Sequence, residues 1–196
     1  MGSLSILEIY KILKENKVVF FDFVTLSKLT NYSNKNTLYK IAQKLEKKKI
    51  IKRLSLGLFL FSEAKVTEFE IANFVYAPSY ISLESALSFY GILSQFPYTI
   101  TSITSKKSKR LLIENKEYRY SKIDDSLFWG YERKKTILIA SPEKALLDSL
   151  YFASKGLINI DLKEMDLTIL NKNLLVKLAK EFNFEAIGDK VKEVTR

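Results

Sequence analysis

The chain has 196 residues, of which 47% are hydrophobic and 13% aromatic. That is enough for one or two domains with packed cores, and it excludes a disordered composition. The sequence contains neither cysteine nor histidine, which excludes disulfides, thiolate nucleophiles, a Ser-His-Asp triad and the usual zinc sites. Any catalysis would need carboxylates with Mg²⁺, or lysine, tyrosine or arginine.

Positive charge is concentrated in the first third of the chain. The formal net charge is +10; residues 1–62 hold 12 Lys or Arg against four acids, whereas residues 63–196 hold 20 against 18. This asymmetry predicts a polyanion-binding domain over residues 1–62, joined to a nearly neutral domain over residues 63–196. A solvated face of a lysine-rich protein explains the charge alone equally well.

The sequence gives no sign of export or membrane insertion. Its apolar runs stay well below the roughly 18 residues of a spanning helix. The first residues also lack the basic and then apolar layout of a signal peptide. We therefore expect a cytoplasmic protein with no membrane partner.

Helical patterns begin at the start of the N-terminal domain. Ser5 and Glu8 fit a capping box for a helix that runs to about Asn16. Residues 18–23 form a short strand or a packed connection, and Thr25 can cap a short second helix. This domain therefore opens with two helices.

A third, basic helix is expected after a polar turn. Ser33 or Asn34 caps it, and its apolar residues repeat at i, i+3, i+4 and i+7. These apolar residues are Leu38, Ile41, Ala42 and Leu45. A β-hairpin follows, with strands at residues 50–53 and 58–61 and with Gly57 supplying the permissive backbone of the turn.

The order helix, helix, turn, basic helix and hairpin is that of a winged helix-turn-helix. In such a domain the start of the third helix faces base edges, and flanking groups hold the phosphates. Asparagine pairs with adenine and lysine donates to guanine, so Lys35 and Asn36 are the preferred readers. For Asn34, a purely capping role is an equal alternative. The candidates for reading bases are Asn34, Lys35, Asn36, Thr37, Tyr39 and Lys40. The candidates for phosphate contacts are Lys44, Lys52 and Arg53.

The sequence after residue 62 predicts a mixed α/β domain with a small, mainly antiparallel sheet flanked by helices. The fold class is therefore α+β. Helix starts are clearest at Ser82, whose helix ends at Gly91, and at Ser141-Pro142-Glu143. Residues 80–83 form a short strand or an extended entry to the helix. Strands are expected at residues 99–105, 111–113, 118–123, 128–131 and 136–140, the first three of them antiparallel. Further helices are expected near residues 66–75, 162–165 and 171–182, and at the C-terminus.

Three blocks of this domain resemble the AbiEi family, the antitoxins of AbiE-type (type IV) toxin–antitoxin systems. The blocks are residues 78–91 (PSYISLESALSFYG), 100–104 (ITSIT) and 139–148 (IASPEKALLD). Gly57-Leu58-Phe59 precedes them at the spacing that the family shows, and the similarity covers roughly residues 4–155. Capping explains most residues of the first and third blocks, so packing is the favoured interpretation of both.

The resemblance implies a function for each domain. The N-terminal domain would bind double-stranded operator DNA, expected to contain inverted repeats, and repress the protein's own operon. The C-terminal domain would oppose a partner toxin that resembles a nucleotidyltransferase, in abortive infection and phage defence.

Two other classes of function compete with this interpretation. One is a stand-alone winged-helix regulator whose C-terminal domain senses a ligand in a concave pocket. The other is an enzyme that uses Mg²⁺ at carboxylates. The carboxylates available for it are Asp124, Asp125, Asp161, Glu164 and Asp166. Asp124 and Asp125 fall in a predicted turn and Asp161 can cap a helix, so we expect no catalysis, no cofactor and no metal.

Overall fold

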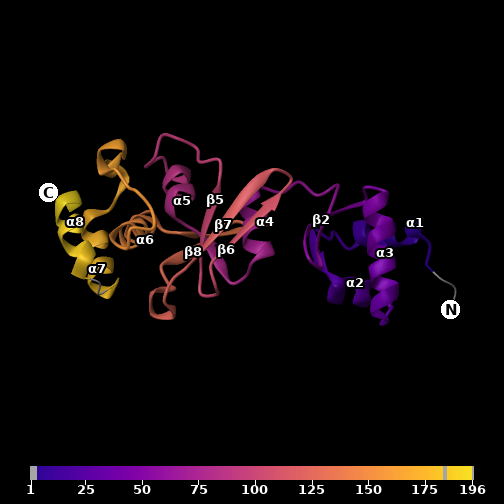
Figure 1. Ribbon diagram of the computed structural model, residues 1–196. Coiled ribbons are helices and arrows are strands. Elements are labelled where there is room, and N and C mark those ends of the chain that lie inside the picture. The colour runs from indigo at the N-terminus through magenta and orange to yellow at the C-terminus, as the bar shows by residue number, and fades with distance from the viewer. Residues whose placement is uncertain (1–3, 183–184, 196) are drawn as a thin grey trace. The chain divides into compact units, whose positions relative to one another are not determined.

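The computed structural model describes residues 4–182 and 185–195, and it is a mixed α/β protein (Figure 1). In this described part, eight α-helices accompany a three-stranded antiparallel sheet and a six-stranded mixed sheet. Contacts between Cα atoms divide the chain into two compact units, Met1–Thr67 and Glu68–Arg196. None of the helices in the described ranges is long and apolar enough to cross a membrane.

The N-terminal unit contains three helices and three strands. In chain order they are α1 (Ile6–Glu15), β1 (Phe20–Asp22), α2 (Phe23–Thr30), α3 (Lys35–Lys47), β2 (Ile51–Ser55) and β3 (Leu58–Phe61). The capping box predicted for α1 is confirmed, since the Glu8 amide donates to Ser5 Oγ at 3.2 Å and the Ser5 amide donates to Glu8 Oε2 at 2.6 Å. The basic third helix and the hairpin are also confirmed.

The second helix begins earlier than the sequence suggests. Asp22, not Thr25, is its N-cap: Asp22 Oδ1 accepts hydrogen bonds from the Thr25 amide and hydroxyl, both at 2.8 Å. The prediction that Thr25 caps this helix is therefore wrong. Thr25 lies inside the first turn because an aspartate three residues before it already satisfies its amide.

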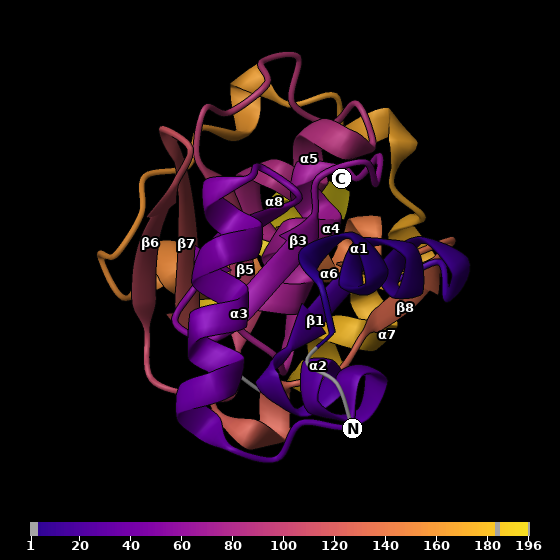
Figure 2. The same ribbon diagram turned by 90° about the vertical axis from the view of Figure 1, so that its right-hand side faces the viewer.

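The three strands of this unit form one small sheet in the order β1-β3-β2. Its register places Phe21 opposite Phe59, and Ile51 opposite Phe61. Gly57 forms the hairpin turn with a φ of +74°, a conformation that side chains with a Cβ disfavour. Figure 2 shows α3 upright, with α1 and α2 beside the strands. The core between them consists of Ile9, Leu13, Phe21, Leu26, Leu38, Ile41, Ala42, Leu45, Ile51, Phe59 and Phe61.

The C-terminal unit is built on a six-stranded sheet in the order β6-β7-β5-β4-β9-β8. The strands are β4 (Ser79–Ile81), β5 (Ile100–Thr104), β6 (Lys109–Ile113), β7 (Lys116–Lys122), β8 (Tyr131–Lys134) and β9 (Ile137–Ala140). The α-helices are α4 (Glu68–Val75), α5 (Leu83–Phe89), α6 (Pro142–Ser154), α7 (Lys172–Phe182) and α8 (Glu185–Thr195). Three short 3₁₀ turns are η1 (Asp125–Leu127), η2 (Leu162–Glu164) and η3 (Leu167–Ile169).

The pairing of these strands differs from the expectation in one place. The hairpin β6–β7 is antiparallel as predicted, but β7 lies between β6 and β5 and runs parallel to β5. Burial explains the choice, because β7 carries the buried Tyr118 and Tyr120, whereas β6 is mostly exposed and forms the edge. The strand expected at residues 128–131 is also wrong. Residues 128–130 belong to no strand and follow η1, and β8 begins only at Tyr131.

Helices α4 and α6 cover opposite faces of this sheet. The register places Tyr80 opposite Ile103 on β5, and it places Tyr120 opposite the neighbouring Ser102. Successive residues of a strand point to opposite faces, so the two tyrosines do as well. The Tyr120 hydroxyl donates to a carbonyl of α4, that of Ala72, whereas the Tyr80 hydroxyl donates to a carboxylate of α6. The sheet is thus the middle layer of this unit.

Candidate nucleic-acid interface

The exposed face of α3 is a stripe of polar and basic side chains. Its buried side consists of Leu38, Ile41, Ala42 and Leu45, as predicted. The residues that oppose this apolar stripe follow one another at intervals of four, three and four, which keeps them on one helical face. They are Asn36, Lys40, Gln43 and Lys47, and all four are exposed. The candidates drawn from the sequence omitted Gln43 and Lys47, although their spacing relative to the apolar residues would have identified them.

At the start of α3, one residue caps the helix and the next two expose their side chains. Asn34 is the N-cap, and its Oδ1 accepts hydrogen bonds from the amides of Asn36 at 2.9 Å and Thr37 at 3.2 Å. These two hydrogen bonds are the ones that a helix cap requires, so they support the alternative that Asn34 is a capping residue. Lys35 and Asn36 are exposed and Thr37 is half-buried, so Lys35 and Asn36 have the more accessible side chains.

One flank of α3 is held by an ion pair with the hairpin. Arg53 on β2 donates to Glu46 Oε2 from Nη2 at 3.0 Å and from Nε at 3.2 Å. Its guanidinium also lies 5.8 Å from the ring centroid of Tyr39 and 5.1 Å from that of Phe59. A phosphate at Arg53 would therefore compete with Glu46. The neighbouring Lys52 is exposed on the same strand.

The other flank of α3 borders a hollow of about 700 Å³. Lys40 and Lys44 lie on the wall that α3 provides, together with Thr37. The opposite wall comes from the start of α1 and the end of α2. Its residues are Leu4, Ser5, Ile6, Thr30, Asn31 and Tyr32. Two predicted DNA contacts, Lys40 in the polar stripe and Lys44 beside it, thus line the same hollow.

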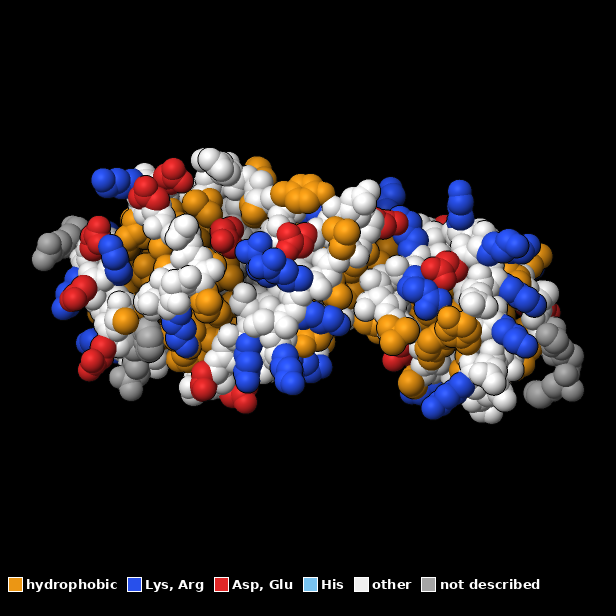
Figure 3. Space-filling view, in the orientation of Figure 1, with side chains coloured by type: hydrophobic (Ala, Val, Ile, Leu, Met, Phe, Trp, Pro, Cys, Tyr) orange, Lys and Arg blue, Asp and Glu red, His pale blue; other side chains and the backbone are white. Residues whose placement is uncertain are grey.

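In the face shown in Figure 3, Lys and Arg side chains are spread over this unit, with hydrophobic and uncharged groups between them. The sequence accounts for their number, with 12 Lys or Arg and four acids in residues 1–62. A surface of one sign attracts a polyanion over a Debye length and speeds its encounter. The predicted site residues therefore lie in the part of the chain with the larger excess of positive charge.

In the C-terminal unit, the first and third blocks meet at a buried ion pair. Lys144 on α6 pairs with Asp148 one turn later, and both side chains are fully buried. Asp148 Oδ2 also accepts hydrogen bonds from the Ser82 hydroxyl at 2.7 Å and the Tyr80 hydroxyl at 3.1 Å. Lys144 Nζ donates to the Tyr80 hydroxyl at 3.0 Å. Four side chains of the two blocks therefore form one closed polar cluster.

The second block supports this cluster from β5. The Thr101 hydroxyl donates to the Ser82 carbonyl at 2.7 Å, and the Thr101 amide donates to Ser85 Oγ at 2.8 Å. Ser82 was predicted to cap α5, but it makes no side-chain capping bond because its hydroxyl is directed to Asp148. The favoured packing interpretation of the first and third blocks gains support from this arrangement.

Burial sets the protonation preferences of the cluster. Desolvation lowers the pKa of Lys144, while the charge of Asp148 opposes that shift. Desolvation likewise raises the pKa of Asp148 and, well above its usual range, that of Tyr80. Because both members of the ion pair are fully buried, the cluster offers no surface to a substrate.

Three of the five carboxylates considered for Mg²⁺ accept hydrogen bonds in local turns. Asp124, Asp161 and Asp166 each accept a hydrogen bond from the backbone amide two residues later, at 2.9–3.0 Å. Side-chain hydrogen bonds from Ser126 and Thr168 lower the pKa of Asp124 and Asp166. Across residues 4–182 and 185–195, no group of three or more acidic residues is arranged to hold a metal ion.

Comparison with known proteins gives no match to any family model and none to a curated protein. The likeness to AbiEi antitoxins consequently depends on the three blocks and their order.

Proposed function

We propose that the N-terminal unit is a winged helix-turn-helix that binds duplex DNA. The observation that carries the proposal is the exposed polar and basic face of α3, which lies opposite its buried stripe. In this proposal α2 and α3 are the helix-turn-helix, and the hairpin of β2 and β3 is the wing. The sheet order β1-β3-β2 ties the wing to the helical core.

Recognition would begin at the first turns of α3 in the major groove. Asn36 can pair with adenine through two hydrogen bonds, and Lys35 can donate to guanine. Lys44 and Lys52 are the phosphate contacts on the two flanks, because both are exposed cations outside the central stripe. Tyr39 is 46% exposed and packs near Phe23 and Arg53, so it would add contact area beside the readers.

We also propose that the whole chain is the antitoxin of a toxin–antitoxin pair, repressing its own operon and opposing a nucleotidyltransferase-like toxin. The three blocks that resemble AbiEi antitoxins support this proposal. They pack together in the C-terminal unit, where β4 pairs with β5 and β9, and Ser82 with Asp148.

The DNA-binding proposal is tested by fluorescence anisotropy with the DNA upstream of the gene and with a scrambled duplex. Phosphate contacts release counterions, so affinity should fall by orders of magnitude between about 50 and 200 mM salt. Lys52→Ala should weaken binding to both DNAs and reduce the salt slope by about one. Lys190→Ala, a change on α8 of the C-terminal unit, is the matched control. Affinity that stays flat across the salt titration contradicts the proposal.

The antitoxin proposal is tested by co-expression with the neighbouring gene, if it encodes a nucleotidyltransferase-like protein. The full chain should restore growth that this protein alone arrests. A chain that binds its operator but never restores growth would retain the repressor half of the proposal and reject the antitoxin half.

A second candidate function is a regulator whose C-terminal unit responds to a ligand. The observation that favours it is a pocket of about 610 Å³ in that unit, a size typical of small-molecule sites. The two candidates differ in a simple measurement, because only the second predicts that a small molecule changes operator affinity.

A further inference from the structure

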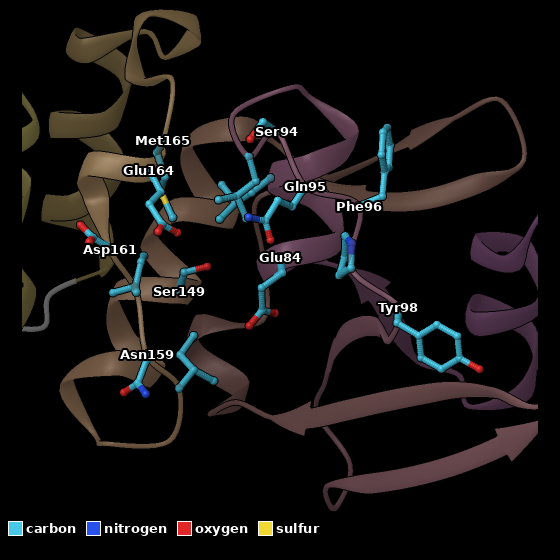
Figure 4. A pocket seen from close by; sticks show the side chains of 15 residues that line it. Glu84, Ser94, Gln95, Phe96, Tyr98, Ser149, Asn159, Asp161, Glu164 and Met165 are labelled. Atoms are coloured by element: carbon cyan, nitrogen blue, oxygen red, sulfur yellow. The ribbon is translucent and has the colours of Figure 1, made fainter.

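The pocket of the C-terminal unit is formed by three segments that are distant in sequence (Figure 4). They are α5 with the chain that follows it, the residue Ser149 of α6, and the segment from Ile158 to Met165. An antiparallel bridge between Leu93 and Met165 and a hydrogen bond from the Asp166 amide to the Ile92 carbonyl, at 2.8 Å, hold two of these segments together. The pocket is therefore a product of the tertiary fold.

Apolar and polar groups share the pocket wall about equally. Leu87 is buried, and three of the other aliphatic side chains are half-buried. The aliphatic residues and methionine of the wall are Leu87, Leu93, Ile158, Ile160 and Met165. Phe96 and Tyr98 are 88% and 66% exposed, and Figure 4 shows them extending away from the middle of the pocket. An occupant would thus contact aliphatic groups on one part of its surface and polar groups on another.

The charged groups of the pocket are all of one sign. Glu84, Asp161 and Glu164 line it, whereas none of the described lining residues is Lys or Arg. This is notable in a chain with 32 Lys or Arg and 22 acids. Asp161 is engaged in capping η2, so Glu84 and Glu164 are the carboxylates that face the space. An anionic ligand would be repelled by these carboxylates.

Glu84 is the group that most clearly lacks a partner. Its Oε2 is buried and accepts no hydrogen bond within the described structure. A carboxylate oxygen removed from water without a partner is costly, and the same side chain lines the pocket, where a cation near it would stabilise its negative charge. Figure 4 shows Glu84, Gln95 and Ser149 directed toward the middle of the pocket. Ser149 donates its hydroxyl proton to the Ala145 carbonyl at 2.8 Å, which leaves its oxygen as an acceptor.

We propose that this pocket binds an organic cation with an apolar body, its ammonium or guanidinium group at Glu84 and its apolar part against Leu87 and Leu93. A divalent metal fits less well, because the acidic residues within the described ranges form no metal-holding group. This proposal names the class of ligand for the second candidate function. Binding in the pocket does not depend on that function, whereas an effect of the ligand on DNA binding does. Calorimetry without DNA tests the site separately from that function.

The experiment measures binding of three probes that share one apolar body, at constant ionic strength, by isothermal titration calorimetry. 4-Phenylbutylamine should bind the full chain, whereas 4-phenylbutanol should bind at least about tenfold more weakly because it lacks a charge-assisted hydrogen bond. 4-Phenylbutyrate should not bind. Equal binding of the amine and the alcohol, or no binding of the amine, overturns the proposal.

Glu84→Gln, with a control variant and a fallback variant, tests whether the cation binds at Glu84. Glu84→Gln keeps the shape and removes the charge, so it should weaken amine binding at least about tenfold. Glu132→Gln, an exposed change on β8 outside the pocket, should leave it unchanged. If Glu84→Gln fails to fold, Gln95→Trp at an exposed position of the pocket rim should block amine binding instead. Unchanged binding in the variant that folds overturns the assignment.

The same chemistry can come from a free amine or from a lysine side chain of a partner protein. A peptide with one lysine between two glycines and with both ends blocked separates the two sources. Binding of this peptide as well as the amine identifies a protein side chain as the occupant, and binding of the free amine alone identifies a small molecule. Either result supports an organic-cation site.

Discussion

The two asparagines at the start of α3 have different contacts although they are two positions apart. Asn34 Oδ1 caps two backbone amides, whereas the side chain of Asn36 is exposed on the stripe opposite the core. Sequence alone could not separate the two roles, because asparagine serves both as a helix cap and as a reader of adenine. The structure shows the capping bonds of Asn34 and the exposure of Asn36, and reading by Asn36 stays a prediction.

We predict that Asn36→Ala changes recognition without changing stability. Its loss should cost about 1–3 kcal/mol on the operator and little on random DNA. Asn34→Ala is the matched control, and it should lower the free energy of unfolding by about 1 kcal/mol through loss of the cap. Anisotropy and thermal denaturation measure the two effects. If Asn36→Ala lowers the melting temperature and leaves the operator-to-random ratio unchanged, Asn36 is a structural residue.

The buried pair of Lys144 and Asp148 makes a second prediction at the scale of single residues. Asp148→Ala leaves the Lys144 ammonium buried without its counterion, which should cost about 3–5 kcal/mol of unfolding free energy. The double variant Lys144→Met with Asp148→Leu removes both charges and should lose much less. Urea denaturation compares the variants. Equal stability of the single and double variants would show that Lys144 does not depend on Asp148.

At the scale of elements, the sequence predicted best where the signal is local. Caps and helical periodicity located α1, α3 and the start of α6, where Ser141 Oγ accepts from the Lys144 amide at 3.2 Å as expected. The order of the strands in the sheet depends instead on contacts between residues that are far apart in the sequence. The insertion of β7 between β6 and β5 depends on which strand buries its tyrosines, and no spacing within the sequence encodes that choice.

The candidate interface likewise combines features that local sequence predicts with features that depend on tertiary contacts. Helical spacing identified the basic face of α3, but it could not reveal that Glu46 holds Arg53, because that ion pair joins α3 to β2. The pocket around Glu84 was equally hidden, since it needs α5, α6 and the segment after Ile158 to come together.

The cap of α2 gives a prediction for pH dependence. Backbone and side-chain hydrogen bonds from Thr25 lower the pKa of Asp22 in the folded chain. A depressed pKa adds stability above the unfolded-state value of about 3.9, and that contribution is lost as pH falls through the folded value. Asp22→Ala should therefore cost about 1 kcal/mol near pH 7 and progressively less below about pH 4. Urea denaturation across this range is the measurement, and a difference that does not change with pH contradicts the role of the charge.

At the scale of the whole molecule, the two compact units support a separation of functions. A fragment of residues 63–196 should lose operator binding, because it lacks α3 and the hairpin. We predict that it retains some protection against the cognate toxin. Circular dichroism establishes that the fragment folds, and a growth assay measures protection. A folded fragment that gives no protection, where the full chain does, would show that the two units act together.

The parallel pairing of Ile81 with Ile139 has a consequence for synthesis on the ribosome. The N-terminal unit has every strand of its sheet once Phe61 has emerged, so it can fold while the rest is still being translated. Strand β4 emerges soon afterwards, but its partner β9 and the counterion pair on α6 come much later. During translation the nascent chain therefore holds all strands of the N-terminal sheet while the C-terminal sheet still lacks β9.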